Sequence, residues 1–277
     1  MKNSLPGSLV AAIEASLTRA FDRYGAIAKF IVPSEFMRSL IVASGVDVDQ
    51  VMIARYPVAS DACFSVDSPS RPRFVYAGRL SPEKGLDVLL AASAKLRGRA
   101  DIVLVGRGPL ERALSRRIAS ERLPIEMCGF IDDPSVLRRE FRRSTAMVVP
   151  SISYENAPMA VLEAASVGLP SVASKIGGIP EIVEHDVTGL LVPPGKAEPL
   201  ASALENLAAD AQYAASLGKN AWKRAQTTND PDRYLRALLS CYTEVVGKHF
   251  DCTQDFRAQE PRDGEVATHD LEPEADS

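Results

Sequence analysis

The stretch FVYAGRLSPEKGLDVLLAASAKLRGRADIVLVG, residues 74–106, holds two short apolar runs separated by a helical pattern. The runs FVYAG (74–78) and DIVLVG (101–106) are nearly continuous in apolar residues, as strands buried on both faces of a parallel sheet are. Between them, leucines recur at helical spacing over residues 84–97. Strand, helix and strand in this order predict one βαβ unit.

The same alternation continues along the chain as far as residue 193. Four further apolar runs predict strands: IEMCGF (125–130), AMVVP (146–150), SVAS (171–174) and GLLVP (189–193). Helical patterns lie near residues 109–121, 134–143, 158–167 and 180–184, and then at 197–209, 211–226 and 231–249. The sequence therefore predicts an α/β fold, a Rossmann-like parallel sheet with helices on both faces. In such sheets ligands bind beyond the carboxyl ends of the strands.

Residues 1–58 do not continue this pattern. They predict a helix over 8–22, a strand within AIAKFIVPSEF (26–36), a short helix over 34–44 and a strand in QVMIARYPV (50–58). This is too little for a complete domain, and we interpret it as the end of one.

Bulk composition limits the class of protein. The chain has 277 residues, of which 46% are hydrophobic and 25% charged, as in soluble globular proteins. The start does not read as a signal peptide, and no apolar run is long enough to span a membrane. The four cysteines and three histidines are scattered without metal-ligand spacing, so we expect reduced thiols, a cytoplasmic protein and no metal site.

Charge is distributed unevenly between the body and the C-terminal tail. Residues 251–277 hold nine acidic and two basic residues, which leaves 30 basic and 27 acidic residues in 1–250. The polar, acidic tail is expected to be disordered. A body so close to neutrality argues against binding of nucleic acid.

The common phosphate-binding loops are absent. GRGPLE begins at Gly106 as G-x-G, but Glu111 stands where the dinucleotide fingerprint requires a third glycine. The P-loop pattern G-x-x-x-x-G-K-[ST] does not occur. Instead, Arg79 and Lys84 flank the loop that follows the strand ending at Gly78, where two cations could hold a diphosphate. Alternatively, Lys84 is a solvated residue at a helix start and Arg79 pairs with a nearby acid; the motif alone favours neither reading.

A second motif, YENAPMAVLEAA, places carboxylates on both sides of a helix start. Asn156 is a candidate helix cap, and Pro158 suits the first turn, whose N–H groups attract phosphate. Glu155 precedes the helix and Glu163 lies about one and a half turns into it. Ionised carboxylates accept hydrogen bonds only, so both suit sugar hydroxyls, although each could also be a solvated helix residue. Gly177 and Gly178 then give a loop whose backbone can approach a ligand.

Taken together and in this order, these motifs resemble the donor-binding half of retaining glycosyltransferases of family 4, which have the GT-B fold. The matching segments are GRLSPEKG (78–85), LVGRGP (104–109), GF (129–130), the stretch from Glu155 to Glu163, and GGIPEIVEHDVTGLLVPPG (177–195). The resemblance covers roughly residues 73–210 strongly. It extends to residues 27–58, where AKFIVPSEFMRSLIVASGV looks like the closing strand and helix of the first GT-B domain.

The resemblance implies roles for particular residues. Arg79 and Lys84 would bind the donor diphosphate, Glu163 the ribose, and Glu155 the donor hexose. Glu155, Arg79 and Lys84 would thus carry the catalysis. The implied donor-binding set is Gly78, Arg79, Lys84, Phe130, Ile131, Glu155, Asn156, Ala157, Pro158, Met159 and Glu163. Many family members have Gly and Phe where this chain has Asn156 and Ala157, which we expect to shift sugar selectivity. Neither a cofactor nor a metal is implied.

The implied function is transfer of a hexose from a nucleoside-diphosphate sugar to an acceptor with retention of configuration. The acceptor would be a saccharide, a lipid-linked saccharide or a small molecule, and docking to the inner face of the membrane is compatible with such enzymes. The alternative is a non-catalytic nucleotide-sugar-binding module whose acceptor domain a partner chain supplies. The implied division is a truncated N-terminal acceptor domain (1–58), a linker (59–72), a donor-binding domain (73–228), a C-terminal helix (229–250) and the tail (251–277).

Overall fold

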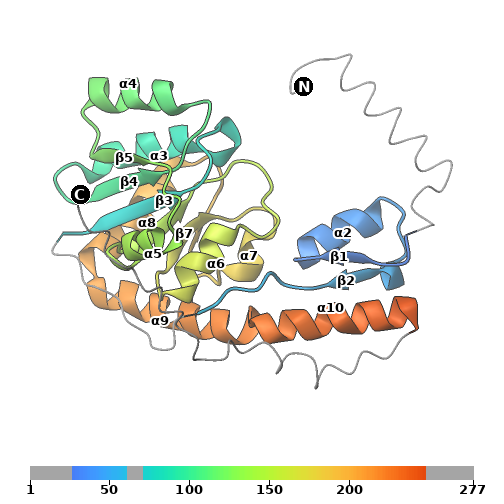
Figure 1. Ribbon diagram of the computed structural model, residues 1–277. Helices are drawn as coiled ribbons and strands as arrows, with labels where there is room; N and C mark the ends of the chain where they lie inside the picture. The colour runs from blue at the N-terminus through green and yellow to red at the C-terminus, as the bar shows by residue number, and fades with distance from the viewer. Residues whose placement is uncertain (1–26, 61–70, 248–277) are drawn as a thin grey trace, which may run out of the picture.

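The computed structural model describes residues 27–60 and 71–247, and its main feature is a six-stranded sheet. All neighbouring strands are parallel, in the order β5-β4-β3-β6-β7-β8 (Figure 1). The strands are β3 (Arg73–Ala77), β4 (Asp101–Val105), β5 (Ile125–Gly129), β6 (Ala146–Val149), β7 (Ser171–Ser174) and β8 (Gly189–Val192). Each agrees with a predicted run to within one residue at either end, so the predicted parallel sheet is confirmed.

The sheet separates two apolar cores. Alternate residues of β3 enter different cores: Phe74 and Tyr76 belong to one, and Val75 belongs to the other. This division follows from the two-residue period of a strand. Every residue of β6 and β7 is buried, whereas β5 at the sheet edge alternates between half-buried and exposed positions. Continuous apolar runs therefore occur where helices cover both faces.

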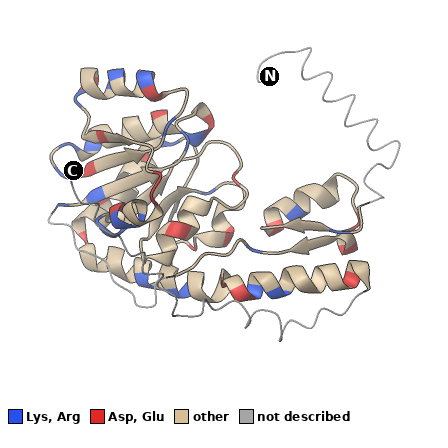
Figure 2. Ribbon diagram, viewed as in Figure 1, with Lys and Arg blue, Asp and Glu red and all other residues tan. Residues whose placement is uncertain are grey.

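Helices cover both faces, as predicted. Leucines of α3 (Leu86–Ser93), α4 (Glu111–Glu121) and α8 (Ala197–Ala209) pack in the core of Phe74. The core of Val75 receives residues of α5 (Pro134–Arg142), α6 (Met159–Ser166) and α7 (Ile179–Ile182). Two longer helices follow, α9 (Ala211–Thr228) and α10 (Pro231–Val246). Acidic and basic residues follow one another along α4 and α10, so neither helix carries charge of one sign only (Figure 2).

The pattern over residues 84–97 does not form one helix, which corrects the prediction there. A 3-10 turn at Pro82–Lys84 comes first, α3 begins at Leu86, and a second 3-10 turn at Ala94–Leu96 ends the segment. Gly85 separates the first two pieces with a left-handed φ of 68°. A Cβ at Gly85 would lie 1.9 Å from the carbonyl oxygen of Pro150, so the turn presses against the end of β6. This contact fixes where the loop after β3 can run.

A second, two-stranded sheet stands apart from the first. Strands β1 (Phe30–Val32) and β2 (Val51–Ile53) pair in parallel, joined by α2 (Glu35–Ala43) and a 3-10 turn at Val48–Gln50. In Figure 1 this small sheet lies beside α10, and the Lys29 ammonium is 2.8 Å from the Glu244 carboxylate of that helix. The strand predicted over 50–58 is thus correct for three residues only.

The rest of that segment runs back toward the main sheet as irregular chain because its backbone groups bond elsewhere. The Tyr56 carbonyl accepts from the Asn229 side-chain amide at 2.7 Å, and the Val58 N–H donates to the Asn229 carbonyl at 2.9 Å. Asn229 stands between α9 and α10, so the segment ends on the junction of those helices.

Some predicted segments lie outside the described residues: the helix over 8–22, most of the linker and the acidic tail. The helix predicted over 231–249 ends at Val246, where Gly247 adopts a left-handed φ of 67°. None of the described helices combines the length and the apolar character needed to cross a bilayer.

Candidate functional site

The carboxyl ends of β3 and β6 meet at the point where the strand order reverses. From β3 the chain proceeds outward through β4 to β5, and from β6 it proceeds in the opposite direction to β8. Loops that leave two such neighbouring strands diverge and leave a space between them, which is the usual ligand position in open α/β sheets. Two adjoining hollows occupy this place.

The first hollow has a volume of about 420 Å³. It is lined by Ala77, Gly78, Arg79, Val105, Gly106, Arg107, Phe130, Ile131, Leu137, Met159, Ala160 and Glu163. The second hollow measures about 240 Å³ and shares the wall of Ala77–Arg79 and Met159–Ala160 with the first. Its further lining residues are Tyr76, Lys84, Met147, Val149, Ser151, Glu155 and Pro158.

Arg79 lies on the wall common to both hollows. Its guanidinium group is exposed and, within residues 27–60 and 71–247, has no hydrogen bond or ion pair, so the alternative of a local acidic partner is not seen there. The backbone beneath it is fixed, because the buried Tyr76 hydroxyl donates a 2.7 Å hydrogen bond to the Arg79 carbonyl. Burial, together with the carboxylates of Glu155 and Glu83, raises the pKa of Tyr76, so this hydroxyl keeps its proton.

Lys84 is not the solvated residue of the alternative reading. Its ammonium nitrogen lies 2.6 Å from Oε1 of Glu155, and both side chains are largely buried. The Ser151 hydroxyl donates to the same carboxylate oxygen at 2.6 Å. The β6–α6 loop (residues 150–158) therefore places Glu155 next to Lys84. These two residues, which were predicted to bind different parts of a donor, contact each other.

Glu163 faces the first hollow from the second turn of α6. Its neighbours Val161, Leu162, Ala164 and Ala165 are all buried. In the described part of the chain the Glu163 carboxylate has neither a hydrogen bond nor an ion pair, although a half-buried carboxylate gains from a donor. It therefore offers acceptor oxygens to whatever fills the hollow.

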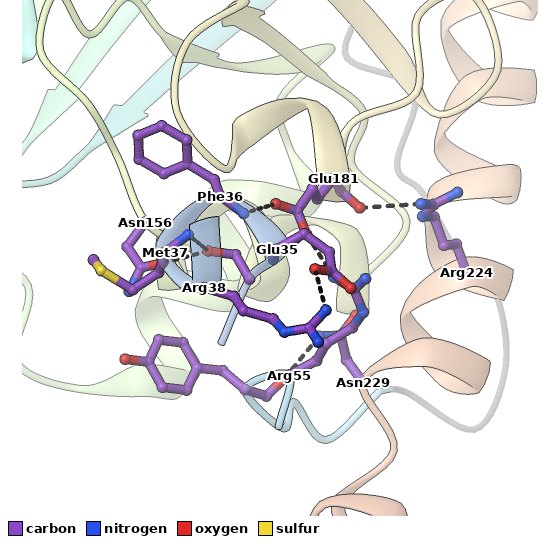
Figure 3. Close-up of polar contacts among 11 residues, drawn as sticks. Glu35, Phe36, Met37, Arg38, Arg55, Asn156, Glu181, Arg224 and Asn229 are labelled. Atoms are coloured by element: carbon purple, nitrogen blue, oxygen red, sulfur yellow. Dashed lines mark hydrogen bonds and ion pairs between the residues drawn. The ribbon is translucent and has the colours of Figure 1, made fainter. Parts of the chain in front are cut away.

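The structure brings nine of the eleven predicted donor-binding residues to the two hollows and leaves out Asn156 and Ala157. Asn156 was also predicted to cap α6, and this is wrong: Pro158 occupies the cap position, and no side chain caps that end. Instead, Oδ1 of Asn156 accepts a 2.5 Å hydrogen bond from the Ser34 hydroxyl, near the start of α2 (Figure 3). Ala157 lies on the far side of the loop, near Arg55 and Glu181.

The glycine pair also has a role other than the one predicted. Gly178 donates its N–H to the Glu155 carbonyl at 2.7 Å. A Cβ on Gly177 would lie 2.3 Å from that same oxygen, and one on Gly178 would lie 1.8 Å from the Asn156 carbonyl oxygen. The glycines therefore approach the β6–α6 loop rather than an open ligand position. Sequence reasoning found the need for close approach but not the partner.

Ser151, Tyr76 and Ser34 were missed by sequence reasoning. Ser151 follows β6 at the carboxyl edge of the sheet, a position that could have identified it. Tyr76 lay inside an apolar run and carried no separate signal. Among the described residues, no group of three or more His, Cys, Asp or Glu side chains is placed to hold a metal ion.

Comparison with known proteins identifies the family. Residues 71–210, about half of the chain, match the family model described as glycosyl transferases group 1. The chain therefore belongs to this family. The amylovoran biosynthesis glycosyltransferase AmsK of Erwinia amylovora is 30% identical over 188 residues, which are 63% of this chain and 46% of AmsK. The chain spans less than half the length of the curated relatives it matches.

Solved structures share the fold. Anabaena HepE in complex with UDP-glucose superposes with a TM-score of 0.68 at 23% identity, over 80% of this chain and 64% of HepE. Sucrose-phosphate synthase of Thermosynechococcus elongatus gives a TM-score of 0.73 at 25% identity, over 83% of this chain and 62% of the synthase. The sheet and its helices are thus those of GT-B glycosyltransferases, as the sequence motifs predicted.

Proposed function

We propose that the two hollows bind a nucleoside-diphosphate sugar. We further propose that the chain is the donor-binding part of a retaining hexosyltransferase of family 4. One observation carries the proposal: Arg79 and Glu163, without partners in the described chain, face one hollow, while Lys84 and Glu155 face the next. A cation and a carboxylate in each compartment suit a ligand with a diphosphate between two hydroxyl-rich sugars. The UDP-glucose in the HepE structure supports this choice of ligand class.

The chemistry follows from charge at the leaving group. When the bond between the sugar C1 and the phosphate oxygen breaks, negative charge develops on the diphosphate. Arg79 and Lys84 would stabilise that charge, together with the N–H groups at the start of α6. The acceptor hydroxyl would attack C1 from the face the diphosphate leaves and pass its proton to the departing diphosphate oxygen, which retains the configuration at C1. Because these cations supply the stabilisation, we propose that donor binding requires no metal.

The remaining roles are assigned by position. Glu163 would accept hydrogen bonds from the ribose hydroxyls, and backbone groups of Phe130 and Ile131 at the outer wall of the first hollow would meet the base. Glu155 would accept from the hexose hydroxyls. The acceptor, any partner chain that holds it, and the cytoplasmic location stay predictions.

Titration calorimetry with UDP, GDP and ADP tests the assignment. We expect Arg79→Ala to weaken binding of the preferred nucleotide by about 1–3 kcal/mol, as for a lost charge-assisted hydrogen bond. Glu163→Gln should also weaken it, because one acceptor oxygen is replaced by a donor. Arg99→Ala is the matched control, since Arg99 precedes β4 at the opposite edge of the sheet and pairs with Glu205. Equal affinity of Arg79→Ala and wild type would contradict the proposal.

A further inference from the structure

Ser34 contacts the β6–α6 loop without lining either hollow. Its side chain is buried and makes two hydrogen bonds, one to Oδ1 of Asn156 at 2.5 Å and one from the Met37 N–H at 3.1 Å. An amide oxygen only accepts, so the Ser34 hydroxyl donates its proton to Asn156 and accepts from Met37. The hydroxyl thereby caps α2 and holds a residue 122 positions away in the sequence.

The start of α2 is itself fixed to α7, one of the helices that cover the main sheet. The Glu181 carboxylate of α7 accepts from the N–H groups of Glu35 and Phe36 at 2.9 and 2.8 Å (Figure 3). The Arg55 guanidinium lies 3.2 Å from the same carboxylate. These bonds satisfy N–H groups of the first helical turn that have no partner within the helix, so α2 is oriented by a residue of α7.

The β6–α6 loop is therefore held from two sides. On one side, Phe36 packs its ring against Tyr154 with centroids 5.1 Å apart, next to the bond between Ser34 and Asn156. On the other side, Gly178 lies against the Asn156 carbonyl; a Cβ there would be 1.8 Å from that oxygen and 3.3 Å from Cβ of Ser34. Asn156, which is half-buried, is thus contacted by both Ser34 and Gly178, and it directly follows Glu155.

We propose that Ser34 is a positioning residue that acts through Asn156 to aim the Glu155 carboxylate into the second hollow. The inference rests on the proposed function, because it assigns Glu155 to the sugar part of the donor. Loss of the bond should leave the nucleotide subsite at Arg79 and Glu163 intact. It should instead let the loop move, which disturbs recognition of the sugar alone.

The test compares UDP with UDP-glucose as probes of the full chain. We expect Ser34→Ala, Ser34→Gly and Asn156→Ala each to weaken UDP-glucose binding by about 5- to 20-fold, with UDP binding changed less than about twofold. Because glycine is tolerated at an N-cap, Ser34→Gly separates loss of the Asn156 bond from loss of the cap. Asn156→Ala keeps the cap and removes the same bond. The double variant Ser34→Gly/Asn156→Ala should be no worse than either single one.

Ser39→Ala is the matched control, since Ser39 carries an exposed hydroxyl that donates to the Phe36 carbonyl of its own helix, α2. A purely structural cap would give a different result: Ser34→Ala alone would be affected, or both probes would weaken in parallel with a lower Tm. Either result overturns the proposal. If wild type binds neither UDP nor UDP-glucose, the positioning role of Ser34 can still be tested. Amide hydrogen exchange of residues 151–158 is then measured in the absence of ligand. Faster exchange in all three single variants would then support positioning although the proposed function had failed, and unchanged exchange would refute it.

Discussion

The ion pair between Lys84 and Glu155 affects how the second hollow can bind a diphosphate. Their charges neutralise each other at 2.6 Å, in a place where both are largely shielded from water. A diphosphate that enters the second hollow meets a cation already engaged and a carboxylate of like charge. Because an ammonium group has three donors, Lys84 can bind phosphate and keep one bond to Glu155.

Neutralisation of Glu155 should therefore separate the two parts of the donor. We expect Glu155→Gln to leave UDP affinity unchanged or to raise it by up to about fivefold, because repulsion is removed and Lys84 becomes available. Affinity for UDP-glucose should fall, since the sugar loses a charged acceptor. Calorimetry with both ligands measures the difference, and Glu184→Gln, at an exposed carboxylate of the loop after α7, is the control. A loss of UDP affinity would contradict this account of the pair.

Tyr76 allows a prediction about pH. Burial and the neighbouring carboxylates raise its pKa in the folded chain above the ordinary value near 10, so above pH 10 the unfolded chain releases a proton that the folded chain retains. The unfolded state then binds fewer protons, and the free energy of unfolding falls as the pH rises. Tyr76→Phe lacks this dependence but loses the bond to the Arg79 carbonyl, at a cost of about 1 kcal/mol at neutral pH.

Urea unfolding at pH 8 and pH 11 measures this effect. The difference in stability between wild type and Tyr76→Phe should shrink at the higher pH. If the stability difference between wild type and Tyr76→Phe is the same at both pH values, folding does not raise the pKa of Tyr76, and the prediction is wrong. Tyr242→Phe, at an exposed ring of α10, is the control.

At the scale of elements, the N–H groups at the N-terminus of α2 find acceptors on a side chain of another helix, α7. Ser34 supplies one acceptor within the helix, and Glu181 supplies the acceptors for two N–H groups. A carboxylate at this end also interacts favourably with the helix dipole. The position of α2 thus depends on α7, an element only four residues long.

Removal of the Glu181 carboxylate should loosen α2 selectively. We expect Glu181→Ala to lower the free energy of unfolding by about 1–3 kcal/mol, because two donors lose their partner. Amide exchange should accelerate at Glu35 and Phe36 while β3 and β4 stay protected. Glu184→Ala serves as the control, since that carboxylate is exposed and forms an ion pair with Arg224. Unchanged exchange at the two amides would refute the role of Glu181.

Sequence reasoning succeeded where local pattern decides the structure. The six strands of the main sheet were predicted almost to the residue, because each is a short, mostly apolar run bounded by turn residues. Sequence reasoning failed where a contact with a residue far away in the sequence determines the local structure. Gly85 interrupts a regular leucine pattern because the Pro150 carbonyl approaches it, and Asn156 leaves the cap of α6 because Ser34 offers a better partner. Neither partner is visible in a local window.

At the scale of the whole molecule, the reversal of strand order explains why the site residues converge. Arg79 follows β3 and Glu155 follows β6, and these strands are neighbours although 68 residues separate Ala77 from the start of β6 at Ala146 by way of β4 and β5. The carboxyl ends of parallel strands lie at one edge, so the site could be predicted as a group from the sequence. The pairing of Lys84 with Glu155 could not, because it depends on side-chain geometry within the group.

The link between the two sheets yields a prediction at the same scale. Asn229 is buried and joins the chain at Tyr56 and Val58 to the junction of α9 and α10. Asn229→Ala should cost about 1–3 kcal/mol of unfolding free energy, because the Tyr56 carbonyl loses its donor. Asn220→Ala, which removes an exposed bond to the Val187 carbonyl, should cost much less. Denaturant titration followed by circular dichroism compares the two, and equal costs would contradict the prediction.

The ion pair in the second hollow has a consequence for turnover under the proposed function. A site that grips a dianionic product tightly would be slow to release it. Under that function, Glu155 would compete with the spent diphosphate for Lys84, and after the sugar has departed the carboxylate, which Ser151 also contacts, would pair with Lys84 again. The returning carboxylate would act as an internal counterion and help to expel the product.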